Sequence, residues 1–168
     1  LSVILAILWS ISIEEQFYFV WPLIVSFVKE KFITIILGLI IIGSTIFRLI
    51  NADNYNIVHY STFSVLSDLA LGCLVGFLTF KIPKSENKIK ALFNKKNTLV
   101  LYVSLIIATL IKMFPPQWLS ASNTYKAILP LIFSSIFILI ILEQNYSSNS
   151  FFKASKIKSI TYLGQISY

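Results

Sequence analysis

The sequence predicts an all-α fold, a polytopic bundle of transmembrane helices with about five complete spans and the start of a sixth. Of the 168 residues, 57% are hydrophobic and only 12% are charged, and the mean hydropathy is +0.81. Soluble domains carry about twice that fraction of charged residues. The charges that are present gather between long apolar runs, which is typical of a protein that crosses a membrane several times.

Five apolar stretches are long enough to cross the roughly 30 Å of hydrocarbon in a bilayer, at about 1.5 Å per helical residue. They cover residues 11–28, 32–50, 62–80, 98–114 and 125–143, and a sixth begins near Ile160. Residues 1–8 are also apolar, and they belong either to the end of an earlier span or to a segment at the membrane interface.

The connections between these stretches show no internal repeat. The Lys- and Asn-rich stretch 81–97 is typical of a solvated loop rather than of a linker between domains. We therefore expect a single transmembrane domain over residues 1–168. Because the chain opens on Leu1, has its only methionine at Met113 and stops inside the sixth span, we expect this domain to be incomplete at both ends.

Basic residues alternate along the connections. Lys29 and Lys31 lie in the first, six lysines lie in 81–97, and three lie in 153–158, whereas 51–60 and 115–124 contain no Lys or Arg. The positive-inside rule then places the first, third and fifth connections in the cytoplasm. It makes the protein a multi-pass membrane protein and explains the net charge of +7 without a nucleic-acid partner.

Two adjacent carboxylates, Glu14 and Glu15, precede Gln16 within a Trp- and Phe-rich apolar stretch. A charge near hydrocarbon costs roughly 2.5 to 3.5 kcal/mol on insertion scales, so such residues are candidates for a functional site. A structural alternative stays open. Ser12 and Glu15 have the spacing of a capping box at a helix start, which would use Glu15 but not Glu14.

Asp68 follows Ser64 by four residues and precedes Gly72 and Gly76 by four and eight, so the four residues share one helical stripe. Small residues on that stripe would allow close helix packing and turn Asp68 into the bundle. Arg48 is the opposite charge nearest by topology, and we predict that Arg48 and Asp68 form an ion pair. A purely structural role for this pair stays open.

The remaining polar residues give weaker signals. His59, the only histidine, lies in a short outer connection where a general base is conceivable, although an exposed histidine beside Tyr60 is more often incidental. Glu143 ends the fifth span and is expected to meet lipid headgroups or lysines, without a functional role. Cys73 is the only cysteine, so the sequence predicts no disulfide, and we expect no metal and no bound cofactor.

Several aromatic residues fall near the predicted outer boundary of the membrane. They form a belt of the kind found at membrane interfaces, or alternatively they stack on sugar rings. These residues are Tyr55, Tyr60, Trp118 and Tyr125.

The stretch Trp9-Ser-Ile-Ser-Ile-Glu-Glu-Gln-Phe-Tyr-Phe-Val-Trp-Pro-Leu23 closely resembles the signature of the integral-membrane acyltransferase family 3, the bacterial O-acetylases of surface polysaccharide and peptidoglycan. Residues 62–72 and 162–168 resemble two later segments of that family, in the expected order. The resemblance covers roughly the last two-thirds of such a protein. Many members carry an arginine near Val65 or Ser67, which this sequence lacks.

The resemblance implies transfer of an acyl group, usually acetyl from acetyl-CoA, to a hydroxyl of a cell-surface carbohydrate. It also implies an essential histidine, preceded by a basic residue, in an earlier membrane helix that lies before Leu1. We hypothesise that Glu14 and Glu15 are catalytic, with Glu14 orienting that histidine, and that Ser12, Gln16, Arg48 and Asp68 bind substrate. The partners would be the lipid bilayer, acyl-CoA and a carbohydrate acceptor, and the resemblance implies a multi-pass protein of the bacterial cytoplasmic membrane. The Lys-rich loop 81–97 could then attract the phosphates of coenzyme A, or its charge could reflect orientation alone.

The alternative is a non-enzymatic transporter or exporter of polysaccharide or lipid-linked units, in which buried charges line a pathway. A histidine in a helix upstream of Leu1 would favour the enzyme, because a transporter has no need of it.

Overall fold

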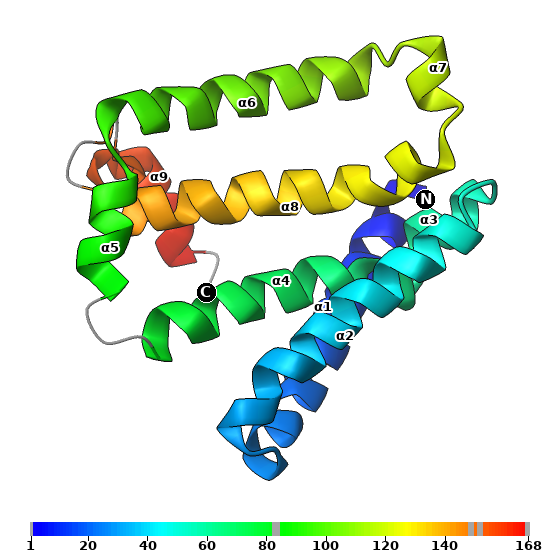
Figure 1. Ribbon diagram of the computed structural model, residues 1–168, viewed down its shortest axis with the longest axis horizontal. Helices are drawn as coiled ribbons and strands as arrows, with labels where there is room; N and C mark the ends of the chain where they lie inside the picture. Colours follow the sequence, from blue (N-terminus) through cyan, green and yellow to red (C-terminus); the bar gives the residue numbers. More distant parts are fainter. Residues whose placement is uncertain (1, 82–84, 148–149, 151–152, 167–168) are drawn as a thin grey trace. The chain divides into compact units, whose positions relative to one another are not determined.

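The computed structural model describes residues 2–81, 85–147, 150 and 153–166, and its regular structure in these ranges is helical (Figure 1). This confirms the all-α prediction. Lys84 of the predicted loop, and Ser167 and Tyr168 of the terminal segment, lie outside the described residues. The helices are α1 Ser2–Phe27, α2 Glu30–Ile50, α3 Tyr55–Tyr60, α4 Thr62–Lys81, α5 Ser85–Leu92, α6 Lys95–Met113, α7 Gln117–Ser120, α8 Asn123–Tyr146, the 3-10 turn η1 Ala154–Lys156, and α9 Lys158–Ile166.

Four helices in the described ranges are long and apolar enough to cross a membrane. They are α2, α4, α6 and α8, and they coincide with the predicted spans 32–50, 62–80, 98–114 and 125–143. The predicted span 11–28 coincides with the later part of α1, which is helical over 26 residues but is not among these four. Residues 2–8 belong to α1 itself, rather than to a separate earlier span.

Two connections contain more helix than the sequence predicts. The stretch 81–97, expected to be a loop, holds the eight-residue helix α5. The connection 51–60 holds α3, whose first turn is capped by the Asn54 side chain accepting from the Ile57 N–H at 3.4 Å. The helix α9 begins at Lys158, where the sequence predicts the start of a sixth span.

The chain forms two compact units. Unit 1 comprises Leu1–Phe77 and Pro116–Ser134, and unit 2 comprises Leu78–Pro115 and Ser135–Tyr168. Each has its own hydrophobic cluster, centred on Ile33, Leu37 and Ala70 in unit 1 and on Phe93, Leu101 and Ile136 in unit 2. The single domain expected over residues 1–168 stays a prediction.

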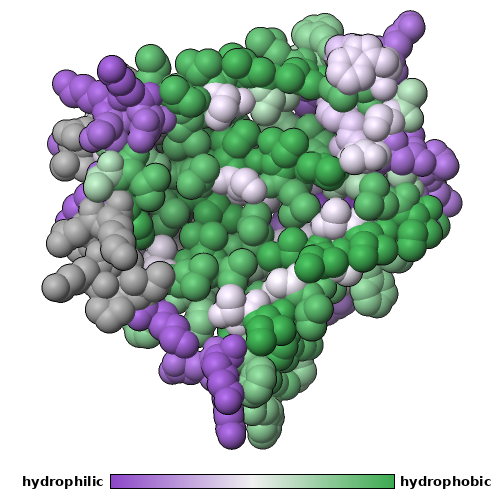
Figure 2. All heavy atoms as spheres, in the orientation of Figure 1, coloured by the Kyte–Doolittle hydropathy of each residue, from purple (hydrophilic) through white to green (hydrophobic). Residues whose placement is uncertain are grey.

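Helix α2 shows how the sequence sorts its two faces. Its buried positions are Ile33, Leu37, Ser44 and Arg48, spaced by four or seven residues and therefore on one side of a helix. The opposite side exposes large aliphatic side chains, namely Ile35, Leu39, Ile42 and Ile46. Hydrophobic residues likewise cover most of the helical surface visible in Figure 2, while hydrophilic ones gather at connections and helix ends. Such a surface suits lipid as its surroundings, and Arg48 continues the protein-facing stripe.

Candidate functional site

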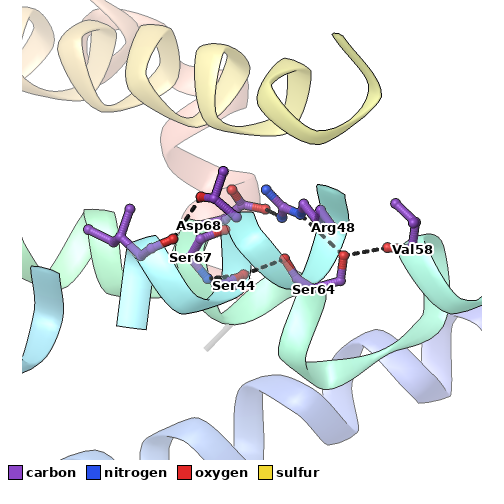
Figure 3. A network of polar contacts seen from close by, with 8 residues as sticks. Ser44, Arg48, Val58, Ser64, Ser67 and Asp68 are labelled. Carbon is purple, nitrogen blue, oxygen red and sulfur yellow. Dashed lines mark hydrogen bonds and ion pairs between the residues drawn. The ribbon is translucent and has the colours of Figure 1, made fainter. Parts of the chain in front are cut away.

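A buried ion pair joins the C-terminal end of α2 to the N-terminal half of α4 in unit 1. The Arg48 Nη2 donates to Asp68 Oδ2 at 2.8 Å, and the exposed fractions of the two side chains are 2% and 26%. Figure 3 shows both side chains reaching across the gap between the helices. The predicted contact between Arg48 and Asp68 is therefore confirmed, while its role in the reaction stays a proposal.

Three serines surround this pair. The Arg48 Nε donates to Ser64 Oγ at 3.2 Å, and the Ser64 hydroxyl donates in turn to the Val58 carbonyl at 2.6 Å. Ser44, one turn before Arg48, donates to the Ser64 carbonyl at 3.1 Å and accepts from the Ser67 N–H at 3.3 Å. Ser44 was not among the predicted site residues, although its position four residues before Arg48 places both on one face of α2.

The network leaves several hydrogen-bonding atoms unused. Arg48 Nη1, Ser67 Oγ and Asp68 Oδ1 are buried and have no hydrogen-bond partner among the described residues. A buried polar atom left unsatisfied costs about 1 to 3 kcal/mol, so such atoms are rare and call for an explanation. Here Arg48 Nη1 can donate a hydrogen bond, Asp68 Oδ1 can accept one and the Ser67 hydroxyl can do either. The site therefore suits a ligand that has both donor and acceptor groups.

The expected stripe of small residues around Asp68 is wrong. Gly72 and Gly76 are exposed, and a Cβ added to either would meet nothing within 4 Å. The packed face of α4 instead carries Ser64, Ser67 and Ala70. Asp68 sits at the edge of that face, where Arg48 reaches it, so charge attraction rather than close helix packing holds it there.

Helix α1 packs through residues spaced four apart. Ile13 and Phe17 are buried, and the Phe17 ring stacks on Trp21 at 5.6 Å between centroids. At 3.6 residues per turn, Glu14 flanks this stripe by about 80°, and Glu15 lies on the opposite side of the helix. Both carboxylates are exposed, and neither has a hydrogen-bond or ion-pair partner among the described residues.

The capping-box interpretation of Ser12 and Glu15 is wrong. Helix α1 begins at Ser2, so both residues lie in its interior, where no free amide groups require a cap. The Ser12 hydroxyl instead accepts a long hydrogen bond of 3.4 Å from Gln16 Nε2, one turn later. Glu15 therefore joins Glu14 as a carboxylate without a structural partner in the described part of the chain.

The first half of α1 is tied to the connection between α2 and α4. The Trp9 Nε1–H donates to the Tyr60 carbonyl at 2.8 Å, which places Trp9, five residues before Glu14, beside the end of α3. Glu14, Arg48 and His59 therefore lie on three helices, α1, α2 and α3, that all belong to unit 1.

The interpretation of Glu143 as a surface residue is also wrong. Glu143, in α8, is fully buried, and its Oε2 accepts from the Tyr102 hydroxyl at 3.1 Å and from Gln144 Nε2 at 2.8 Å. Gln144 also accepts from the Ala154 N–H at 2.9 Å, and its carbonyl accepts from Lys153 Nζ at 2.9 Å. This network lies in unit 2 and anchors the chain that follows α8.

Comparison with known proteins finds relatives that include O-acetyltransferases of two bacterial species. Over 96% of its length the chain is similar to "O-acetyltransferase OatA" of Staphylococcus aureus (strain NCTC 8325 / PS 47), with 28% identity over 180 residues. It is also similar to "Peptidoglycan O-acetyltransferase OatA" of Listeria monocytogenes serovar 1/2a, with 25% identity over 173 residues and the same share of this chain. The aligned region spans 27% and 26% of the length of these relatives.

No family model matches the chain, and no solved structure matches it. Membership of acyltransferase family 3 therefore stays a prediction. The similarity along almost the whole chain nevertheless relates this protein to bacterial O-acetyltransferases.

Proposed function

We propose that this chain is part of a membrane O-acetyltransferase that transfers an acetyl group from acetyl-CoA to a hydroxyl of peptidoglycan or of another cell-surface carbohydrate. The observation that carries the proposal is the similarity to O-acetyltransferases over 96% of the chain. The buried polar network of α2 and α4 supports it, because acyl transfer needs polar groups held in a site that excludes water.

The proposed reaction converts the thioester of acetyl-CoA into an oxygen ester of the acceptor hydroxyl. The acceptor hydroxyl oxygen forms a bond to the carbonyl carbon of the acetyl thioester, and the carbon–sulfur bond breaks. The hydroxyl proton leaves through a general base and ends on the thiol of coenzyme A. The protein must therefore supply a base, and it must stabilise the negative charge that develops on the carbonyl oxygen.

The network around Arg48 is suited to the second task. In the buried guanidinium, Nε donates to Ser64 and Nη2 donates to Asp68. Nη1 stays available to donate to a developing oxyanion. A fixed cation in a site sheltered from water stabilises such an oxyanion more strongly than it would in water. Asp68 Oδ1 could accept from a second hydroxyl of the sugar, which would orient the acceptor.

Helix α1 would supply the carboxylates. Glu14 flanks the packed stripe, so its carboxylate can meet a further helix without breaking the contacts of Ile13 and Phe17. We propose that it orients the imidazole of an upstream histidine, which would act as the base. In the same proposal Glu15 takes part in catalysis or holds the acceptor, together with Gln16 and Ser12.

The variant Glu14→Gln tests this proposal in the full-length protein, because it removes the charge and keeps the shape. In cells lacking the wild-type gene, ester-linked acetate on purified peptidoglycan should fall by at least about a hundredfold, the smallest effect expected for loss of acid–base catalysis. The matched control is Glu30→Gln, which makes the same change at an exposed carboxylate at the start of α2. Glu30 lies outside the proposed site.

Immunoblots of membrane fractions would show that both variants insert at the wild-type level. Full acetylation by a normally inserted Glu14→Gln variant would refute the assignment of Glu14. Isolated membranes given labelled acetyl-CoA should transfer the label to glycan only when the gene is intact. A transporter would give no such transfer.

A further inference from the structure

The short helix α3 carries a continuous set of aromatic rings. The Tyr55 ring stacks on His59, with 5.0 Å between centroids and 15° between planes, and His59 meets the edge of Tyr60 at 5.4 Å and 88°. Tyr60 then makes an edge contact with Trp9 of α1 at 5.4 Å and 80°. Each ring adopts an arrangement that aromatic pairs favour, so the four rings support one another.

This ring set is held in place by backbone contacts at three points. The Trp9 Nε1–H donates to the Tyr60 carbonyl at 2.8 Å, and Asn54 caps the start of α3. The Val58 carbonyl accepts from the Ser64 hydroxyl at 2.6 Å, and that hydroxyl also accepts from Arg48. The rings are therefore fixed to the same serine that positions the Arg48–Asp68 pair.

The set is open to its surroundings. None of the residues of α3 is buried, and Tyr55 and Tyr60 have exposed fractions of 68% and 46%. The connection 51–60 contains no Lys or Arg, which predicts an outer location. Exposed polar side chains lie next to the rings in the sequence, namely Asp53, Asn54 and Asn56. They can form hydrogen bonds with hydroxyl and acetamido groups.

We propose that Tyr55, His59 and Tyr60 form a platform on which the sugar rings of the acceptor glycan stack. The inference rests on the proposed function and deepens it by assigning an acceptor-binding site. Sugar rings present an apolar face of C–H groups and an edge of hydroxyls, so stacked aromatic rings beside amide and carboxylate groups match both features.

An aromatic belt at the membrane interface is the competing explanation. Belt residues each place an amphipathic ring at headgroup level, so belt function depends little on which single ring is removed. Trp118, with an exposed fraction of 74%, is a suitable belt residue because no ring contact joins it to the platform among the described residues. The two explanations therefore differ in what they expect of Tyr55 and Trp118.

The test measures binding of soluble peptidoglycan glycan strands, freed of peptides, to the detergent-solubilised full-length protein by calorimetry. Tyr55→Leu should raise the Kd about fivefold to tenfold, the effect of losing one stacked ring, whereas Tyr55→Phe and Trp118→Leu should bind like the wild type. An unchanged Tm for each variant would show that the exposed substitutions leave the fold intact. Wild-type affinity in Tyr55→Leu, or an equal loss in Trp118→Leu, would overturn the platform.

Acetylation rates separate this inference from the proposed function. Tyr55→Leu should raise the glycan concentration that gives half the maximal rate and leave the maximal rate unchanged. If the wild-type protein binds glycan through Tyr55 but transfers no acetyl group, the platform stands and the proposed function fails. If acetyl transfer is normal and binding is independent of Tyr55, the proposed function stands and the platform fails.

Discussion

We predict that Arg48 and Asp68 contribute a coupling energy typical of a buried salt bridge, larger than that of an ordinary hydrogen bond within a membrane. The perturbation is a double-mutant cycle of Arg48→Met, which keeps the length of the side chain, and Asp68→Ala. Since the Arg48 side chain is 2% exposed and that of Asp68 is 26% exposed, the two single substitutions should differ in cost.

Asp68→Ala leaves the guanidinium buried without an anion, and we expect it to lower the free energy of unfolding by about 3 kcal/mol. Arg48→Met leaves a carboxylate that is a quarter exposed and can be partly solvated, so the expected loss is smaller, about 1 to 2 kcal/mol. The double variant leaves neither charge unpaired, and its loss should not exceed that of Arg48→Met. The coupling energy should therefore reach about 3 kcal/mol or more.

The assay is reversible unfolding of the full-length protein in mixed micelles with rising SDS, followed by tryptophan fluorescence. The control cycle uses Lys126 and Asp53, which lie 3.7 Å apart with exposed fractions of 37% and 87% and should couple by no more than about 0.5 kcal/mol. A coupling near 0.6 kcal/mol for Arg48 and Asp68, typical of membrane hydrogen bonds, would refute the reasoning from burial. In activity, a double variant that loses as much as the two singles combined would show that the pair does not act as a unit.

Two further predictions concern stability in the same assay. Glu143→Gln should change the free energy of unfolding by no more than about 0.5 kcal/mol, since the buried Oε1 has no partner to lose. Glu143→Ala should lower it by about 2 to 4 kcal/mol, because it leaves a cavity and a Tyr102 hydroxyl without its acceptor. Equal losses in the two variants would show that the charge itself holds the network. Trp9→Phe keeps an aromatic ring but loses the 2.8 Å hydrogen bond to the Tyr60 carbonyl, and it should lower the free energy of unfolding by about 1 kcal/mol. The control Trp118→Phe should lower it by less than about 0.5 kcal/mol. Similar losses in the two variants would contradict a specific hydrogen bond between α1 and α3.

The transmembrane helices were predictable because the physics is local. In hydrocarbon every backbone N–H and C=O must be satisfied within the segment, so a long apolar run becomes a helix whatever it packs against. This holds for α2, α4, α6 and α8. The ion pair was predictable for a similar reason, because two opposite charges near the joined ends of neighbouring helices have few other partners.

The errors arose where short patterns were interpreted without their context. The Ser12 and Glu15 spacing fits a cap, but residues 2–8 form an apolar run without Gly, Pro or another turn signal, so the helix continues through the pattern. Gly72 and Gly76 share a stripe with Asp68, but the aliphatic and serine face of α4 made the contacts instead. Which of two possible faces packs depends on the neighbouring helix, which one segment cannot reveal.

The sequence by itself determined which long apolar segments are helical and which charges would be costly in a membrane, and it predicts which ends are cytoplasmic or outer, since these follow from hydropathy and charge along one segment. Only the tertiary structure decided which partners those charges have. Glu143 meets Tyr102 from 41 residues away, and Trp9 meets Tyr60 from 51 residues away. No periodic pattern encodes such contacts, because they arise when separate helices pack and their polar groups must find partners in the same small volume.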